Sequence, residues 1–202
     1  LVLDSAKDRL VKSGIKTVET HLRNGDFVDT VTEFQDNSNM IVIGKRGEAA
    51  DFAKMHLGSN LERLIRSTNK PVLVTARAFK PIERILLAFD GGKSSFGAVE
   101  HLSSNSIYSN LECHIVVAGQ DGSQGHKKSS SAENLLKKAG INYKLFFERG
   151  EPEKVISDHV EKHRIHLLVM GAYGHSRIRN LIIGSTTTQM IRSCLVPVLL
   201  FR

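Results

Sequence analysis

The sequence has few of the residues that mark disulfide-bonded, membrane-spanning or nucleic-acid-binding proteins. Only two of its 202 residues are cysteines, Cys113 and Cys194, and they fit no metal-ligand spacing. We therefore expect both to be reduced, buried and small apolar side chains in a cytoplasmic protein. No run is long and apolar enough to span a membrane, and residues 1–13 do not resemble a signal peptide.

Aromatic residues are also scarce, at 6% of the chain, although the formal net charge is +7. A basic protein can attract polyanions. The lysines and arginines are scattered rather than gathered into a stripe, however, and few rings are available to stack on bases. Nucleic acid is therefore not the expected partner. A chain with 41% hydrophobic and 24% charged residues is typical of a globular protein of one or two domains.

The second part of the chain alternates apolar strands with amphipathic helices. Strands are expected at Arg84–Asp90, Cys113–Ala118, Ile141–Phe147, His166–Met170 and Val198–Phe201, and helices after Lys93, at Ala132–Ala139, at Pro152–His163 and after Ser185. The near-continuous apolar runs are typical of parallel strands covered on both faces. This order predicts an α/β fold with a parallel sheet between two helix layers. The polar segment 119–131 is expected to be mobile.

The first part contains a shorter series of elements. The pattern predicts a helix over residues 1–13, a strand at Ile15–Leu22, a helix at Val28–Gln35, a strand at Met40–Ile43, a helix opened by the capping box at Ser59, and a strand at Val72–Val74. Residues Arg77 to Pro81 are expected to form a linker.

The two parts are copies of one unit, because a shift of 126 residues overlays the chain on itself. The matching pairs are Gly14 with Gly140, Gly58-Ser59 with Gly184-Ser185, Ile65-Arg66-Ser67 with Ile191-Arg192-Ser193, and Pro71-Val72-Leu73 with Pro197-Val198-Leu199. These matches fall at turns, caps and core strands. The repeat predicts two domains, residues 1–79 and 82–202.

The first copy has no counterpart of the first strand, first helix and second strand of the second copy. In a doubly wound sheet of order 3-2-1-4-5, those strands lie between the ones that remain. We therefore expect the natural protein to begin before Leu1. Each copy ends in an apolar edge strand that needs cover, Val72–Val74 or Val198–Phe201, so these two strands are the expected contact between the copies.

A glycine loop follows a buried strand in the second copy, with the pattern Gly171-x2-Gly174-x9-Gly184-Ser185. Glycines allow backbone amides to approach a ligand closely, and the helix after Ser185 offers free N–H groups and the positive end of its dipole. The loop therefore predicts an anion site, and phosphate is the natural ligand.

With this loop, the strand before it and Pro197-Val198-Leu199 after it, the chain resembles the universal stress protein family across both copies. The resemblance implies two Rossmann-like repeats, each built on a five-stranded parallel sheet, packed as an internal pseudo-dimer. It also implies ATP binding, with or without Mg²⁺, and no strong catalytic activity. A homodimer is left open.

The resemblance also assigns positions of the second copy to the nucleotide. Asp90 matches the aspartate that lies at the adenosine, and the backbone of Val117 or Ala118 matches the position at adenine. The ribose and phosphates would be bound by the loop and by the helix that follows it: Gly171, Gly174, Gly184, Ser185 and Thr186, with added charge from His175, Arg177 or Arg179.

The first copy departs from this pattern. Its spacing is Gly44-x2-Gly47-x10-Gly58-Ser59, one residue longer. Its loop contains Glu48 and Asp51, which would repel phosphates, together with three cations that would attract them: Lys45, Arg46 and Lys54. Nucleotide binding is therefore less expected in the first copy. In both copies, the alternative is that the loop is only a turn that packs the fourth strand against the fourth helix.

Three other chemistries have weaker support in the sequence. The segment Asp90-Gly91-Gly92-Lys93-Ser94-Ser95 faintly resembles the pyrophosphate loop of the PP-loop ATP pyrophosphatases, with the aspartate and first serine exchanged. His159 and His163 lie one helical turn apart, with His166 nearby, but no cysteine joins them, so no metal site is expected. Nothing supports a Ser-His-Asp triad.

Together with these patterns, the resemblance implies a cytoplasmic tandem protein that binds ATP in its second repeat and acts as a stress-response sensor or regulator, with slow hydrolysis at most. The alternative is a tandem binding module that works without nucleotide, through a protein or another small molecule. An ATP-using enzyme of the PP-loop type is the third possibility.

Overall fold

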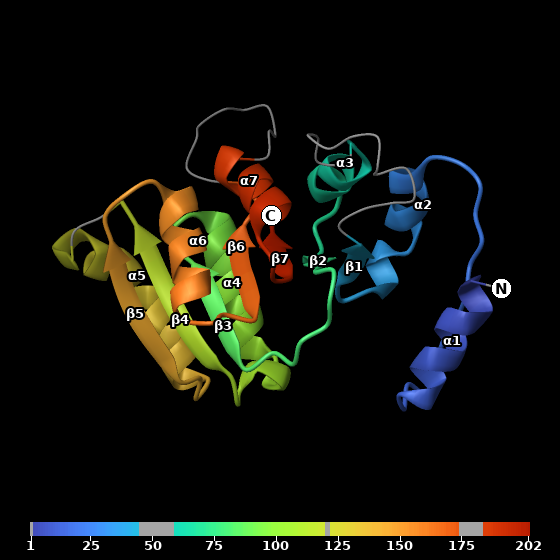
Figure 1. Ribbon diagram of the computed structural model, residues 1–202, viewed down its shortest axis with the longest axis horizontal. Helices are drawn as coiled ribbons and strands as arrows, with labels where there is room; N and C mark the ends of the chain where they lie inside the picture. The colour runs from blue at the N-terminus through green and yellow to red at the C-terminus, as the bar shows by residue number, and fades with distance from the viewer. Residues whose placement is uncertain (1, 45–58, 120–121, 174–183) are drawn as a thin grey trace.

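In the computed structural model, which describes residues 2–44, 59–119, 122–173 and 184–202, the chain forms one seven-stranded sheet (Figure 1). The strands lie in the order β1-β2-β7-β6-β3-β4-β5. Their bounds are β1 Ile41–Gly44, β2 Val72–Thr75, β3 Arg84–Ala88, β4 Glu112–Ala118, β5 Tyr143–Glu148, β6 Leu167–Gly171 and β7 Val198–Phe201. Every neighbouring pair is parallel except β2 and β7, which are antiparallel.

The five strands of the second repeat confirm the expected doubly wound order. Strands β7, β6, β3, β4 and β5 lie side by side, which is the order 5-4-1-2-3 within the repeat. The central strands are buried on both faces, as their continuous apolar runs predicted: Leu86, Leu168 and Val169 have no exposed surface.

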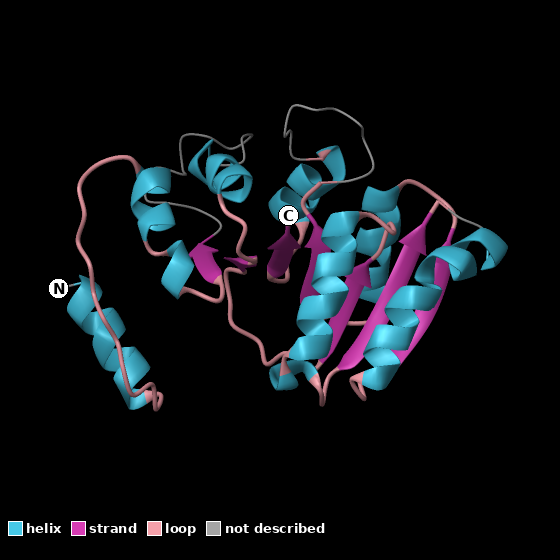
Figure 2. Ribbon diagram, turned by 180° about the vertical axis from the view of Figure 1, so that it is seen from behind, coloured by secondary structure: helices cyan, strands magenta, loops and turns pink. Residues whose placement is uncertain are grey.

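Helices cover both faces of this sheet (Figures 1 and 2). The described helices are α1 Val2–Lys12, α2 Phe27–Glu33, α3 Ser59–Ser67, α4 Lys93–Ser104, α5 Gly122–Lys138, α6 Pro152–Lys162 and α7 Ser185–Ser193, with short 3-10 turns at Gln35–Asn37 and Ser106–Tyr108. Helices α3, α6 and α7 share one apolar core with one face of the sheet. Helices α4 and α5 share a second core with the other face.

The two repeats join through strands β2 and β7, as the edge-strand argument predicted. Val72 pairs with Leu200, Leu73 with Leu199 and Val74 with Val198, so the two partial sheets become one. The C-terminal end of α3 strengthens this seam. Its carbonyl groups at Ile65 and Arg66 accept hydrogen bonds from the Tyr173 hydroxyl, at 3.4 Å, and the Arg202 guanidinium, at 2.6 Å.

Two of the expected elements differ in the structure. The segment Ile15–Leu22 is not a strand. Its counterpart in the second repeat is β5, which pairs only with β4. The described chain contains no counterpart of β4 in the first repeat, so an alternating segment has no partner for its backbone groups.

The polar segment 119–131 was expected to be mobile, but residues 122–131 belong to helix α5. Small residues form the contact face of this helix. Gly125, Ser129 and Ala132 recur at helical spacing and are buried, followed by Leu136. A small contact face lets the helix approach the sheet closely, because a Cβ at Gly125 would overlap the ring of Phe147.

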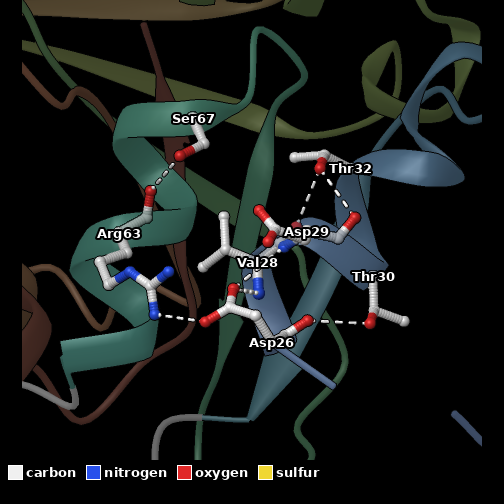
Figure 3. A network of polar contacts seen from close by, with 7 residues as sticks. All are labelled: Asp26, Val28, Asp29, Thr30, Thr32, Arg63 and Ser67. Atoms are coloured by element: carbon white, nitrogen blue, oxygen red, sulfur yellow. Dashed lines mark hydrogen bonds and ion pairs between the residues drawn. The ribbon is translucent and has the colours of Figure 1, made fainter. Parts of the chain in front are cut away.

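A polar network links α2 and α3 in the first repeat (Figure 3). The Asp26 carboxylate caps α2 by accepting from the backbone N–H groups of Val28, at 2.9 Å, and Asp29, at 3.2 Å. Its other oxygen accepts from the Arg63 guanidinium of α3 at 2.8 Å. The hydrogen bond from Arg63 lowers the pKa of Asp26. The predicted helix α1 forms as well, but it buries none of its residues.

The cysteines agree only in part with the expectation. Both are free thiols, and Cys113 is buried on β4, where burial raises its pKa to about 12. Cys194, at the end of α7, is only half-buried because it lies where the helix turns toward the last strand. Among the described helices, none is both long and apolar enough to cross a membrane.

Candidate functional site

The candidate site lies where the strand order of the second repeat reverses. Strand β3 has β4 on one side and β6 on the other, so the chain leaves β3 in one direction and returns on its opposite side. In such sheets the loops after the two strands diverge and open a crevice at their carboxyl ends. Of the predicted residues, Asp90 follows β3 and Gly171 ends β6. Both therefore lie at the same edge of the sheet.

Asp90 shapes the turn between β3 and α4. Its Oδ1 accepts from the backbone N–H of Gly92 at 2.8 Å and from the Ser95 hydroxyl at 2.7 Å. The turn also needs Gly91, whose φ of 78° favours glycine. Asp90 thus presents a half-buried carboxylate whose orientation is held by its own loop.

Gly171 lets β6 approach the start of α4. A Cβ at this position would lie 2.8 Å from the Cβ of Ser94 and 3.2 Å from the backbone nitrogen of Ser95. Gly171 is therefore required for close packing between β6 and α4, which brings the end of β6 next to the loop of Asp90. The family resemblance assigns this glycine to a ligand, and the structure adds a packing role.

The N-terminus of α7 lies just beyond Gly171. The backbone N–H of Gly184 donates to the carbonyl of Ala172 at 3.2 Å, and the Thr187 hydroxyl contacts the carbonyls of Gly171 and Ala172 at 3.2 and 3.3 Å. These contacts fix the start of the helix against the end of β6. Gly184 has no side chain to cap α7, so the N–H groups of the first turn receive no hydrogen bond from a capping side chain.

One contact was not expected at this helix end. The Thr186 hydroxyl donates to the Glu153 carboxylate of α6 at 2.7 Å. Thr186 was assigned to a triphosphate, yet its hydroxyl is bound to an anionic side chain 33 residues earlier in the chain. Glu153 could not be identified from sequence, because only the packing of α6 beside α7 brings it here.

The position assigned to adenine lies at the end of β4. Val117 is buried and Ala118 is half-buried, with the pairs Val117–Phe147 and Ala118–Glu148 on β5. Gly119 follows with a φ of 73°, and its N–H donates to the Glu148 carbonyl at 2.9 Å. Burial of the Val117 side chain leaves its backbone, and the backbone of Ala118, as the groups that a base could contact.

Part of the predicted site lies outside the described residues. This holds for Gly174, His175, Arg177 and Arg179 of the second copy, and for Lys45, Arg46, Gly47, Glu48, Asp51, Lys54 and Gly58 of the first. Gly44 ends β1 and Ser59 begins α3, as expected. In the described sheet β1 is an edge strand that pairs only with β2. Among the described residues, the first copy therefore has no counterpart of the neighbouring pair β3 and β6, at which the strand order reverses in the second.

The histidines considered in the sequence are arranged differently from the expectation. His159 and His163 come together with His114 of β4, which the sequence analysis did not consider. His166 does not join them, because its Nδ1 accepts from the backbone N–H groups of Glu83 and Arg84 at 3.2 and 3.3 Å.

A hollow of about 580 Å³ lies at the other edge of the sheet. Polar residues at the amino ends of the strands line most of it: Glu83, Arg84, Ser109, Asn110, Leu111, Glu112 and Asn142. Gly171 and the start of α7 lie at the carboxyl ends, so this hollow is separate from the candidate site.

Comparison with known proteins gives consistent matches. The profile of the universal stress protein family matches this chain twice, over residues 2–76 and 81–202. Universal stress protein Slr1230 of Synechocystis is 41% identical over 204 residues, which cover all of this chain and 71% of that protein. A universal stress protein of Mycolicibacterium smegmatis is 22% identical, across 92% of this chain and 69% of its own length.

Solved structures show the same fold. A universal stress protein from Archaeoglobus fulgidus superposes with a TM-score of 0.77 at 27% identity, over all of this chain and 74% of its own. A universal stress protein solved in complex with cAMP superposes with a TM-score of 0.51 at 22% identity, over 61% of this chain and 98% of its own.

Proposed function

This chain belongs to the universal stress protein family, and on that premise we propose that its second repeat binds ATP as part of a stress-response sensor or regulator. The observation that carries the proposal is the meeting of three elements at the switch in strand order. Asp90 after β3, Gly171 at the end of β6 and the N-terminus of α7 at Gly184 all lie at one edge of the sheet.

Each element suits a different part of the nucleotide. The Asp90 carboxylate is an acceptor for ribose hydroxyl groups, and its loop holds it in place. The first turn of α7 supplies backbone N–H groups and the positive end of a helix dipole for phosphate oxygens. The end of β4, at Val117 or Ala118, is the position assigned to an adenine base.

The relative solved with cAMP supports an adenine nucleotide as the ligand class, because that protein has the same fold. This chain would need slow hydrolysis at most to act as a sensor, since a bound nucleotide can itself shift a conformational equilibrium. We expect turnover well below about 1 per second, the low end of ordinary enzyme rates.

The contact between Thr186 and Glu153 favours a second candidate, a binding module that works without nucleotide. A carboxylate at the start of α7 opposes the approach of phosphates. In that case the tandem fold would bind a protein or an uncharged small molecule instead.

Calorimetric titration with ATP and Mg²⁺ separates the two candidates. Gly184→Glu places a carboxylate at the N-terminus of α7 and should abolish ATP binding. Leu195→Glu places the same group beyond the C-terminal end of α7, on a residue that is 85% exposed, and should leave ATP binding unchanged. Asp90→Ala should also lose binding.

The proposal is refuted if the wild-type protein does not bind ATP. A parallel titration with cAMP tests the identity of the ligand. Tighter binding of cAMP than of ATP would retain the adenine-nucleotide site but overturn the triphosphate.

A further inference from the structure

Three histidine side chains converge between the sheet and helix α6. His114 comes from β4, and His159 and His163 come from α6 and from the residue that ends it. One ligand nitrogen from each of the three lies within 4.8 Å of the other two. The side chains of His114 and His159 are 3% and 0% exposed, whereas His163 is half-buried.

The fold holds these rings in place. His114 and Val116 are two residues apart and therefore lie on the same face of β4. Val116 packs in one core with residues of α6, so His114 also points toward α6. His159 and His163 lie one helical turn apart with their rings stacked, 4.1 Å between centroids. The ring of Phe146 lies beside all three imidazoles, at 4.6 to 5.3 Å between centroids. The rings are thus packed into one orientation before any ligand arrives.

Two carboxylates hold the outer nitrogens of the buried pair. His114 Nε2 lies 2.7 Å from Glu112 Oε1, and His159 Nδ1 lies 2.9 Å from Glu148 Oε1. The ammonium group of Lys144 also donates to Glu112 Oε1, at 2.7 Å. Both outer nitrogens are therefore donors, since a carboxylate can only accept.

This arrangement leaves the two inner nitrogens facing each other. His114 Nδ1 lies 2.9 Å from His159 Nε2. A neutral imidazole carries one proton, and both protons are already bound toward the carboxylates. Two lone pairs would then point at one another, unless one ring takes up a second proton and becomes an imidazolium. Burial opposes that charge, because the side chains of His114 and His159 have almost no exposed surface.

We propose that a divalent transition-metal ion, Zn²⁺ by preference, binds between His114, His159 and His163. The ion replaces the missing proton and accepts the facing lone pairs, while Glu112 and Glu148 orient the ligands from behind. Imidazole nitrogens suit Zn²⁺, at about 2.0–2.1 Å. Tetrahedral coordination with bonds of this length places two ligand nitrogens about 3.3 Å apart. His114 Nδ1 and His159 Nε2, now 2.9 Å apart, therefore need to move apart only slightly.

The surroundings suit a divalent cation in two further ways. The negative charges of Glu112 and Glu148 offset the charge of the ion. His163 follows the last turn of α6, where the dipole favours a cation, and its partial exposure offers a path from solvent. Three protein ligands leave the fourth position for water. None of these residues belongs to the candidate nucleotide site, so the proposal does not depend on ATP binding.

The experiment uses the full chain after dialysis against a chelator. Zn²⁺ is titrated by competition with a chromophoric chelator, and Co²⁺ serves as a spectroscopic probe. We expect one equivalent of Zn²⁺ bound per chain and a visible Co²⁺ absorption band typical of a four-coordinate site. The thermal midpoint of unfolding should rise with Zn²⁺, because the ion binds the folded state.

His163→Gln is the decisive variant, since a half-buried side chain can be replaced without unfolding the protein. Its affinity for Zn²⁺ should fall by about 100-fold or more, beyond the 10–100-fold typical of lost outer partners. His21→Gln removes an exposed histidine outside the cluster and should change nothing. His159→Gln is the second variant, and its secondary structure is checked by circular dichroism.

Two results would overturn the proposal. In the first, the wild-type protein does not bind Zn²⁺ tightly and gives no Co²⁺ absorption band. The three histidines would then be a buried polar network without a metal. The other is binding that survives in His163→Gln and His159→Gln, because the ion would then be held adventitiously elsewhere.

Discussion

Leu73 of β2 lies directly opposite Leu199 of β7 in the antiparallel pair that joins the repeats. The two residues are 126 positions apart, which is also the offset that overlays the two copies in sequence. The repeats are therefore related by a local two-fold axis that passes between these leucines. The flanking pairs, Val72 with Leu200 and Val74 with Val198, exchange under the same axis. The seam has the geometry of an isologous dimer interface within one chain.

The seam should make a large contribution to stability. Leu199 is 1% exposed, and Leu199→Ala would leave a cavity beside β2. We expect the free energy of unfolding to fall by about 2–5 kcal/mol. Leu195→Ala is the matched control, because Leu195 is 85% exposed, and it should change stability by less than about 0.5 kcal/mol. Urea denaturation measures both, and equal effects would contradict the importance of the seam.

Gly171 should tolerate no larger side chain. Gly171→Ala would bring a Cβ to 2.8 Å from the Cβ of Ser94, so we expect a loss of about 1–3 kcal/mol from overpacking. Gly97→Ala provides the opposite case, because a Cβ there meets nothing within 4 Å on the helix α4. That variant should gain about 0.5–1 kcal/mol from helix propensity. Thermal unfolding of both would show opposite shifts in Tm, and shifts of the same sign would disprove the packing role.

The Asp26 network should make the first repeat sensitive to acid (Figure 3). Because the hydrogen bond from Arg63 lowers the pKa of Asp26, its contribution to stability is present above the ordinary aspartate value of 3.8. That contribution is lost as the pH falls through the lower folded-state pKa. Asp26→Asn can still accept from the N–H of Val28 but carries no charge.

The stability difference between wild type and Asp26→Asn should therefore stay constant at pH values above the ordinary aspartate pKa of 3.8 and shrink as the pH falls below that value. Urea midpoints measured above and below this value test it, with Asp36→Asn as a control outside the network. A difference that stays constant with pH would show that the Arg63 contact contributes nothing through charge.

Glu153 should weaken the proposed nucleotide site. Its carboxylate accepts from Thr186 at the start of α7, where phosphates would bind. If ATP binds there, Glu153→Gln should raise ATP affinity by about threefold to tenfold, equivalent to about 1 kcal/mol of relieved repulsion. Glu161→Gln, on an exposed position of the same helix, should leave the affinity unchanged. Weaker binding in Glu153→Gln would show that Glu153 assists the ligand instead.

Much of the fold could be predicted from local patterns. Three features of the sequence predicted the doubly wound sheet and the edge strands of the seam. They are the apolar runs at β3 and β4, the glycines at the ends of helices and strands, and the internal repeat. These signals are local because periodicity, caps and turn residues act within a few positions along the chain. The strand expected at Ile15–Leu22 shows the limit, because alternation predicts a strand only where a neighbouring strand can pair with it.

The contacts at the sites needed the tertiary structure. His114 lies 45 residues before His159, and strand order and helix docking alone bring them to 2.9 Å. The pairing of Thr186 with Glu153, and the helix of small residues around Ser129, likewise depend on which surfaces pack together.

The sequence by itself determined the repeat, the parallel α/β class and the loop positions, since each rests on spacing along the chain. The tertiary structure decided which side chains share a site, because contacts between distant segments depend on strand order, register and packing.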